Sequence, residues 1–188
     1  MEHVLRCHEI VKTDMVRARG CYLYDVHDKR HIDFESGVWC TALGHNHGRV
    51  NHVIQTQLEQ ITHLNYRYTN TPVEETAMEV ITIIREEDLV ERSNRVGSRF
   101  LRELNGLAER HDIVREVRGR GLMIAMELEA KNEHLSARSV YRELLHRGFI
   151  VGYNPAAHVV RFYPPLTIGK DDIAQLLENL DHILGVSR

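Results

Sequence analysis

An unbroken apolar run over residues 122–126 constrains the fold of this 188-residue chain more than any other stretch. A strand with one face in water alternates apolar and polar residues, whereas a continuous run indicates apolar cover on both faces. We therefore expect a central strand over residues 122–128, with helices before and after it. Just upstream, Gly119 and Gly121 predict a tight turn in which backbone passes close to backbone. The arginines beside these glycines are expected to be solvated on a loop.

The rest of the chain alternates β-prone runs with helical stripes. Residues 21–34 predict a hairpin, and the loop that ends at Gly48 leads into a helix. Thr71, Pro72 and Glu74 form a helix start with an N-cap, a first-turn proline and a capping box. Apolar residues at helical spacing continue over 72–110, as one long bent helix or two consecutive ones. Further patterns predict a helix over 136–148, strands over 149–153 and 158–163, and a last helix from about residue 170.

This order favours an α+β fold, in which a small, mainly antiparallel sheet is packed with helices. The length suits one good core, or two small lobes that share one. We expect a single domain over residues 1–188. Within it, residues 1–71 form an N-terminal segment with the hairpin and a helix, and residues 72–188 form the C-terminal part. The pattern does not give the order of the strands.

Composition and cysteine spacing narrow the functional classes. A net charge of −3 gives no general attraction to nucleic acid or to an anionic membrane, and no apolar run reaches membrane-spanning length. The N-terminus lacks the apolar region of a signal peptide. Cys7, Cys21 and Cys40 are odd in number and widely spaced, which fits a reducing cytoplasm better than a disulfide framework. His45 and His47 are the densest histidine pair, but their spacing gives little reason to expect a metal site.

Two separated blocks carry ordered motifs. The first block holds Gly-Cys-Tyr-Leu-Tyr-Asp-Val at 20–26, Asp-Phe-Glu-Ser-Gly-Val at 33–38 and Ala-Leu-Gly-His-Asn-His at 42–47. The second holds Glu-Glu-Asp-Leu at 86–89, Val-Arg-Gly-Arg-Gly-Leu-Met at 117–123 and Val-Arg-Phe-Tyr-Pro-Pro-Leu-Thr at 160–167. In this order the motifs resemble the class III aminotransferases that use pyridoxal phosphate, the family of ornithine, acetylornithine and 4-aminobutyrate aminotransferases. The resemblance implies the N-terminal segment and the small domain of a fold-type I aminotransferase.

The chain departs from the family between these blocks, which join around residues 74–79 within one helical pattern. There the family would cross its large cofactor-binding domain. Transamination needs a lysine that holds the cofactor as a Schiff base, and a loop of backbone donors that holds its phosphate. None of the lysines, Lys12, Lys29, Lys131 and Lys170, stands in the family's lysine motif. The resemblance therefore implies no catalytic or cofactor-binding residue and no cofactor for this chain alone, although pyridoxal phosphate is the family's cofactor.

The resemblance does imply substrate-binding residues. Arg161 matches the family arginine that binds a substrate carboxylate, a task suited to the two-pronged guanidinium. A structural ion pair, for example with Glu127, is the alternative. The family stretch near the substrate entrance is matched by Ser36, Gly37, Val38 and Trp39. Trp39 is expected as an oligomer contact more than as a ligand platform, because exposed aromatic residues mark interfaces.

Three functional hypotheses follow. The first is a non-enzymatic protein, inactive alone, that acts as an oligomeric or regulatory remnant of a class III aminotransferase. The second is an aminotransferase subunit that a partner chain, such as a full-length relative, completes. The third is a binding module for an amino-acid carboxylate. A homo-oligomer is expected, because loss of a large domain would uncover apolar surface that self-association covers.

Overall fold

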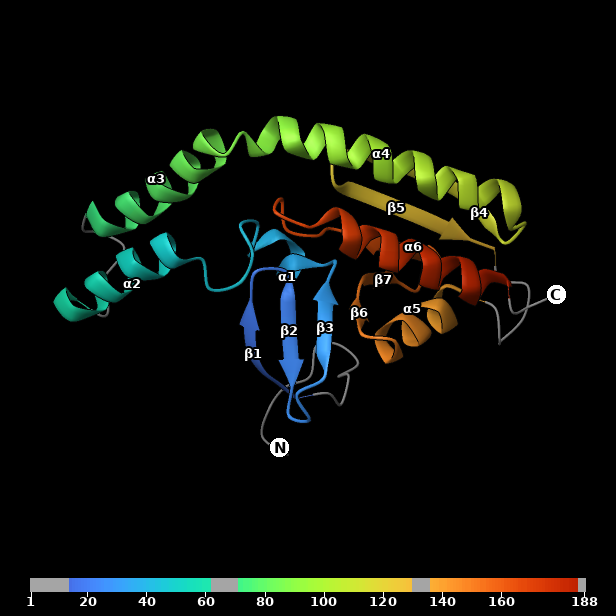
Figure 1. Cartoon of the computed structure of the whole chain (residues 1–188), viewed down its shortest axis with the longest axis horizontal. Coiled ribbons are helices and arrows are strands. Elements are labelled where there is room, and N and C mark those ends of the chain that lie inside the picture. The colour runs from blue at the N-terminus through green and yellow to red at the C-terminus, as the bar shows by residue number, and fades with distance from the viewer. Residues whose placement is uncertain (1–13, 62–70, 130–135, 186–188) are drawn as a thin grey trace.

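The computed structural model describes residues 14–61, 71–129 and 136–185, without the side chains of residues 71–73. Over these residues the chain forms two four-stranded sheets, with helices on the outside (Figure 1). The α+β class and the mainly antiparallel pairing are confirmed. The prediction of one sheet is wrong. The capping role of the Thr71 side chain and the predictions on Cys7, Lys12 and Lys131 fall outside the described residues.

The first sheet contains the predicted hairpin. Its order is β1 (Met15–Arg19), β2 (Tyr22–Asp25), β3 (Arg30–Asp33) and β6 (Phe149–Ile150), with β6 parallel to β3. Asp25 fixes the β2–β3 turn, because its Oδ1 atom accepts the backbone N–H groups of His27 and Lys29 at 2.9 and 3.0 Å. The sheet therefore joins the N-terminal part of the chain to a strand from the C-terminal part.

The second sheet contains the apolar run. Its order is β4 (Val114–Arg120), β5 (Met123–Leu128), β8 (Val159–Phe162) and β7 (Gly152–Asn154), with antiparallel pairing throughout. β5 is an interior strand, as predicted. Helices lie before and after it in the chain, although another strand separates it from the preceding helix, and the prediction of cover on both faces is wrong. β4 comes first, and the side chain of Ile124 is fully buried whereas Met123 is 47% exposed. A half-exposed face tolerates a methionine and the small Ala125, so an apolar run does not require a second covering layer.

The strand predicted over residues 149–153 is also divided. β6 and β7 lie on either side of Val151 and belong to different sheets. Val151 itself is buried. One apolar run thus contributes an edge strand to each sheet, which is why the sequence pattern suggested a single sheet.

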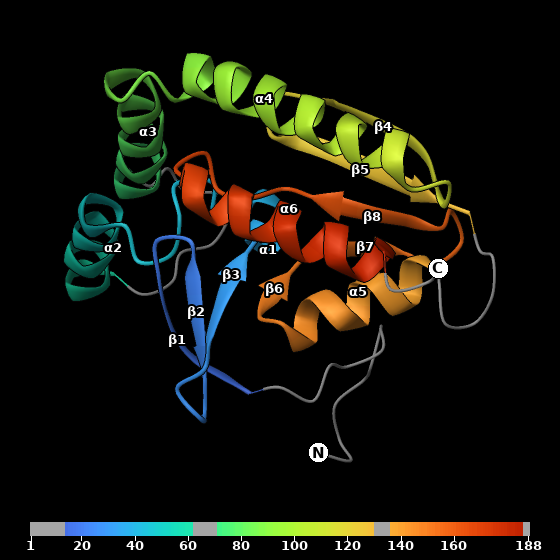
Figure 2. The same cartoon turned by 45° about the vertical axis from the view of Figure 1, so that its right-hand side comes forward.

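Three helices cover one face of the second sheet: α4 (Leu89–Arg110), α5 (Ala137–His146) and α6 (Lys170–Gly185) (Figure 2). Their buried stripes meet in one core with β5 and β8, where the ring centroids of Phe100 and Phe162 are 5.5 Å apart. α4 approaches the β4–β5 turn very closely. A Cβ atom at Gly97 would lie 2.0 Å from the carbonyl oxygen of Gly121, so only glycine fits there.

The remaining helices lie within residues 36–86. The pattern over 72–110 forms two consecutive helices, because α3 (Thr71–Glu86) ends before Asp88, which adopts a left-handed conformation with φ of 49°. α2 (Gly48–Gln60) packs beside α3 and has no buried residue (Figure 1). A small separate core of Leu43, Ile83 and Leu89 anchors this helix pair. One helical turn, α1 (Ser36–Trp39), follows β3.

Candidate functional site

The candidate site lies where the segment after β3 meets the end of β8. Asp33 Oδ1 accepts the backbone N–H groups of Glu35 and Ser36, both at 2.8 Å, and so turns the chain away from the strand. The turn is then attached to Tyr163. The backbone N–H of Tyr163 donates to the carbonyl of Phe34, and the hydroxyl of Ser36 donates to the carbonyl of Tyr163, both at 2.6 Å. Residues from both sequence blocks are therefore held in one place.

The α1 turn has an unusual backbone. Ser36, Gly37, Val38 and Trp39 all have positive φ values, 45°, 55°, 54° and 68°. Such a conformation costs L-residues roughly 1–2 kcal/mol each, and it is least favourable for a β-branched residue such as Val38. The turn buries Ser36 and leaves Val38 and Trp39 58% and 46% exposed. Strained backbone of this kind concentrates at ligand-contacting segments, so the turn is a reasonable part of a site.

Arg161 lies on the half-exposed face of the second sheet, between Ala125 on β5 and Gly152 on β7. Its guanidinium carbon is 5.5 Å from the centroid of the Tyr163 ring, and that ring is 4.8 Å from the ring of Trp39. The Nε atom of Arg161 is buried, and no described residue accepts a hydrogen bond from it. Buried donors are normally satisfied, so this one indicates a position for an acceptor from outside the chain.

Glu35 borders the same space, and sequence reasoning did not select it. A Cβ atom at Gly152 would lie 3.2 Å from Arg161 Nε and 3.4 Å from Glu35 Oε1, so both groups pack closely against this glycine. Burial raises the pKa of the Glu35 carboxyl; the nearby Arg161 opposes this shift and Asp33 adds to it. A cationic and an anionic side chain thus lie near each other beside Gly152.

The structure brings some of the predicted site residues together. Arg161 and Trp39 both lie against the Tyr163 ring, and Ser36 holds the Tyr163 backbone. Gly37 and Val38 are exposed. Tyr163 and Gly152 were not selected from the sequence. Tyr163 could have been found, because it lies two residues after Arg161 in an extended strand and therefore shares its face.

An ion pair between Arg161 and Glu127, the example given for the structural alternative, is not formed. Glu127 pairs instead with Arg118 and Arg115, at 3.0 and 3.5 Å. Arg118 also contacts Glu116 at 2.7 Å, so this arginine lies in a strand with carboxylate partners and not free on a loop. The acidic side chain that the sequence suggested for Arg161 is therefore already occupied.

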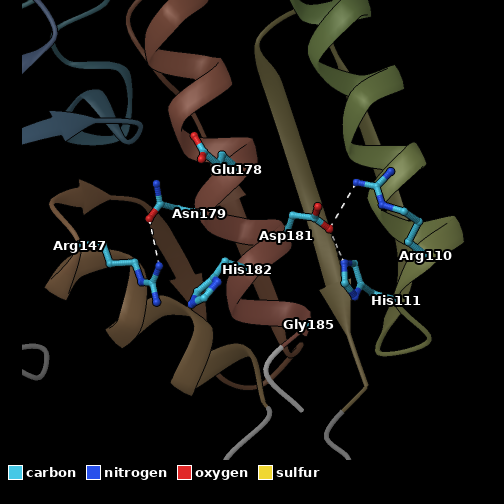
Figure 3. Close-up of a pocket in the computed structure, with 8 residues that line it drawn as sticks. All are labelled: Arg110, His111, Arg147, Glu178, Asn179, Asp181, His182 and Gly185. Carbon is cyan, nitrogen blue, oxygen red and sulfur yellow. Dashed lines mark hydrogen bonds and ion pairs between the residues drawn. The ribbon is translucent and has the colours of Figure 1, made fainter. Parts of the chain in front are cut away.

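A second concave region lies between the C-terminal ends of α4, α5 and α6 and has a volume of about 730 Å³ (Figure 3). It is lined by Arg110, His111, Arg147, Glu178, Asn179, Asp181, His182 and Gly185. Much of its charge is already neutralised. Asp181 accepts from His111 at 2.6 Å and pairs with Arg110 at 3.3 Å, and Arg147 donates to Asn179 at 3.2 Å. The His111 hydrogen bond, helped by Arg110, lowers the pKa of Asp181. These contacts join helices and leave few groups for a ligand.

Comparison with known proteins decides the family. The family model described as aminotransferase class III matches residues 6–79 and 72–184. The chain belongs to the class III aminotransferases. The two matched segments overlap at residues 72–79, inside α3, which agrees with the predicted junction at 74–79.

Curated relatives of this aminotransferase chain are longer. It is 33% identical to an acetylornithine aminotransferase of Methanocaldococcus jannaschii over 108 residues. These residues are 57% of this chain and 25% of that protein. It is 36% identical over 97 residues to ornithine aminotransferase 1 of Staphylococcus aureus, covering 52% and 23% of the two chains. A leucine/methionine racemase of Thermococcus litoralis is 29% identical over 135 residues, or 68% and 30%. The matched stretches therefore span between 23% and 30% of the length of these curated relatives.

Solved structures of ornithine and acetylornithine aminotransferases share the fold. The match to Plasmodium falciparum ornithine δ-aminotransferase has a TM-score of 0.85 at 12% identity, and covers 98% of this chain and 96% of that chain. Acetylornithine aminotransferase from Elizabethkingia anophelis matches with a TM-score of 0.82 at 12% identity, over 97% and 96%. At this identity the likeness establishes the fold alone. In the part of the chain that the structure describes, no helix is both long and apolar enough to cross a bilayer.

The described residues do not provide a site for the family's cofactor. Pyridoxal phosphate needs a lysine beside the substrate groups. Lys29 is exposed in the β2–β3 turn, where its Nζ atom donates to the carbonyl of His146 at 2.6 Å. Lys170 is exposed at the start of α6. Neither of these two described lysines contacts Arg161, so no reaction step through the cofactor follows from this geometry.

Proposed function

We propose that this chain is a non-catalytic class III aminotransferase unit that does not transaminate alone and binds a small carboxylate at Arg161. The observation that carries the proposal is the buried Nε atom of Arg161, which has no acceptor among the described residues. A carboxylate that approaches over Tyr163 would supply the acceptor in a charge-assisted hydrogen bond. Arginine is well suited to this role, because its planar fork can hold both carboxylate oxygens.

Two further observations support the absence of catalysis. The family segments adjoin within α3, where a full-length relative would insert its large cofactor domain, as the resemblance implies. Both described lysines lie apart from the Arg161 face, Lys29 in a turn and Lys170 at a helix start. Without a lysine to hold the cofactor and move the proton, the carboxylate arginine alone provides binding but no turnover.

Completion by a partner chain is the second candidate function. The exposed apolar stripe of α2 favours it, because Ile54 and Leu58 are 42% and 54% exposed on a helix with no buried residue. A second copy or a full-length aminotransferase could cover this stripe. In the latter case the partner would contribute the lysine domain, and the assembly could transaminate.

Incubation of the purified protein with pyridoxal phosphate, followed by borohydride reduction and mass spectrometry, tests the lack of catalysis. We expect no stoichiometric adduct on one lysine and no amino-group transfer. An adduct on a single lysine, with turnover lost when that lysine is replaced, would contradict the proposal. Light scattering gives the number of chains, and addition of a full-length relative tests completion in trans.

Titration with a simple carboxylate, 4-methylpentanoate, tests the binding function. We expect binding by the parent protein and its loss in Arg161→Gln. The matched control is Arg115→Gln, which removes an exposed arginine from β4 of the same sheet. Equal binding by the parent and Arg161→Gln would contradict the assignment of Arg161.

A further inference from the structure

The outer face of α3 carries an exposed stripe that the rest of the described chain leaves uncovered. Met78 and Ile81 lie one helical turn apart and are 54% and 40% exposed. Glu74 and Arg85 are exposed at the two ends of the same stripe, because steps of three or four residues separate all four positions. On the opposite side of the helix, Ile83 is fully buried in the small core. The α3 stripe therefore has an apolar centre between an acidic and a basic end.

The charges at the ends of the α3 stripe differ from those on the side of the helix that faces α2. On that side Arg49 of α2 pairs with Glu79 and Glu86 at 2.5 and 2.6 Å, and so holds the two helices together. Within the residues that the structure describes, Glu74 and Arg85 form no ion pair. The helix pair also projects at one end of the molecule (Figure 1). The α3 stripe is thus accessible to another protein chain.

The order of the charges selects one geometry for a pair of such helices. Glu74 and Arg85 lie equally far from the midpoint of the α3 stripe, and so do Met78 and Ile81. If two copies packed with these helices parallel around a two-fold axis, each charge would face its own equivalent and repel it. In an antiparallel pair, Glu74 of each copy faces Arg85 of the other, and Met78 faces Ile81. The stripe is therefore complementary to itself in the antiparallel direction only.

We propose that the α3 stripe is a self-association surface, on which a second copy of this chain packs its own α3 helix antiparallel. Two symmetric ion pairs between Glu74 and Arg85 flank a centre in which Met78 and Ile81 of the two copies bury each other. The contact is small beside a standard protein–protein interface. We therefore expect a dissociation constant in roughly the micromolar range.

This surface depends on the way in which the two family segments are joined. Residues 72–79 belong to both matched segments, and the α3 stripe continues past them to Arg85. A relative with its large domain inserted here, as the resemblance implies, would not have the same continuous face. The inference therefore rests neither on the assembly of the longer relatives nor on carboxylate binding at Arg161.

Charge reversal at the two ends of the stripe tests the proposal, with sedimentation velocity over a concentration series at low ionic strength. We expect Glu74→Arg and Arg85→Glu each to weaken self-association about tenfold, because two attractions become two repulsions. An equimolar mixture of the two variants should associate as tightly as the parent, because every facing pair in the mixed dimer has opposite charges. Glu75→Arg is the matched control. It makes the same charge change on a neighbouring face of the helix, and it should keep the parental association.

Each other outcome overturns the proposal. A parent that stays monomeric at the highest concentration excludes the self-association surface. Association that neither Glu74→Arg nor Arg85→Glu weakens places the contact elsewhere, and a mixture that does not recover the parental association excludes the antiparallel arrangement. Circular dichroism verifies that each variant folds. If a variant does not fold, the salt dependence of the parent decides, because association that added salt does not weaken excludes the two ion pairs.

Discussion

The second sheet with its three helices and the α2–α3 pair differ in how they bury apolar side chains. In the sheet region, α4, α5 and α6 all contribute fully buried residues to one continuous core. In the helix pair, α2 has an apolar stripe of similar period, but none of its residues is fully buried. Among the described residues, Leu43, Ile83 and Leu89 form the small buried core that anchors the pair.

This difference shows that an apolar periodicity predicts which face of a helix packs against other residues, but not which residues pack against it. The stripe of α4 is covered within the chain by β4 and β5. The stripe of α2, with Ile54 and Leu58, is covered only in part by α3 and otherwise meets solvent. Stability should therefore depend on the sheet region, whereas association should depend on the exposed residues.

The strongest test replaces neighbouring residues of β5. Ile124→Asp would place an unpaired carboxylate in the core, at a cost of about 3 to 5 kcal/mol against a total stability of roughly 5 to 15 kcal/mol. Met123→Asp is the matched control, because its side chain is 47% exposed and needs little change. Urea denaturation followed by circular dichroism measures both. If the two variants unfold alike, the buried face of β5 has been assigned wrongly.

Two glycines of α4 offer a second test. Gly97→Ala should destabilise the protein by about 3 kcal/mol, because the new methyl group would overlap the backbone at Gly121. At Gly106 the nearest atom to an added Cβ is 3.7 Å away, so Gly106→Ala should stabilise the helix by up to about 1 kcal/mol. Thermal denaturation of the two variants should give shifts of opposite sign. A parental melting temperature for Gly97→Ala would contradict the close contact.

A third test replaces exposed apolar residues, which should affect self-association more than the stability of the monomer. In the homo-oligomer that the sequence predicts, Trp39→Ala or Leu58→Ser should weaken self-association by about 2 kcal/mol where the residue is buried in the contact. Neither change should alter the stability of the monomer much, because both side chains are about half exposed. Sedimentation over a concentration series measures association. A monomeric parent at high concentration would exclude the oligomer, and an effect of only one substitution would locate the interface.

The smallest effect concerns the ion pair between α4 and α6. Hydrogen bonding by His111 lowers the pKa of Asp181, so this carboxylate stabilises the fold above the unfolded-state value of about 3.9 and loses that contribution as the pH falls through its lower folded value. The side chain of Asp181 is 46% exposed, and the contribution should therefore stay below about 1 kcal/mol. Asp181→Asn should be less stable than the parent at neutral pH, and the difference should vanish near pH 2. A constant difference across the titration would exclude this origin.

Local patterns in the sequence predicted the element types well. The hairpin, most of the helices and the interior position of β5 follow from periodicity and turn residues, which act over a few positions. β4 was missed because Gly119 and the arginines beside it suggest a loop, whereas pairing with β5 makes it a strand. The division of residues 149–153 between two sheets depends on partners far away in the sequence, and no local pattern encodes it.

Individual residues of the site could be predicted from the sequence, but their arrangement could not. Arg161 and the 36–39 turn came from family motifs, and the structure places Trp39 and Arg161 on the same tyrosine ring. Glu35 has no motif of its own, and its position opposite Arg161 becomes visible only when Gly152 is seen between them. The sequence shows the residue types, but it does not show which residues far apart in the chain lie close together.

The bond from Ser36 to the carbonyl of Tyr163 spans 127 positions of the chain, and the β3–β6 pairing next to it closes a loop of similar size. Contacts of such separation form late in folding, because the entropy of loop closure is lost before the contact is gained. The helices and the β4–β5 hairpin can form from local contacts, but the site cannot exist in any intermediate that lacks this closure. Recovery of ligand binding during refolding should therefore lag behind recovery of helical circular dichroism.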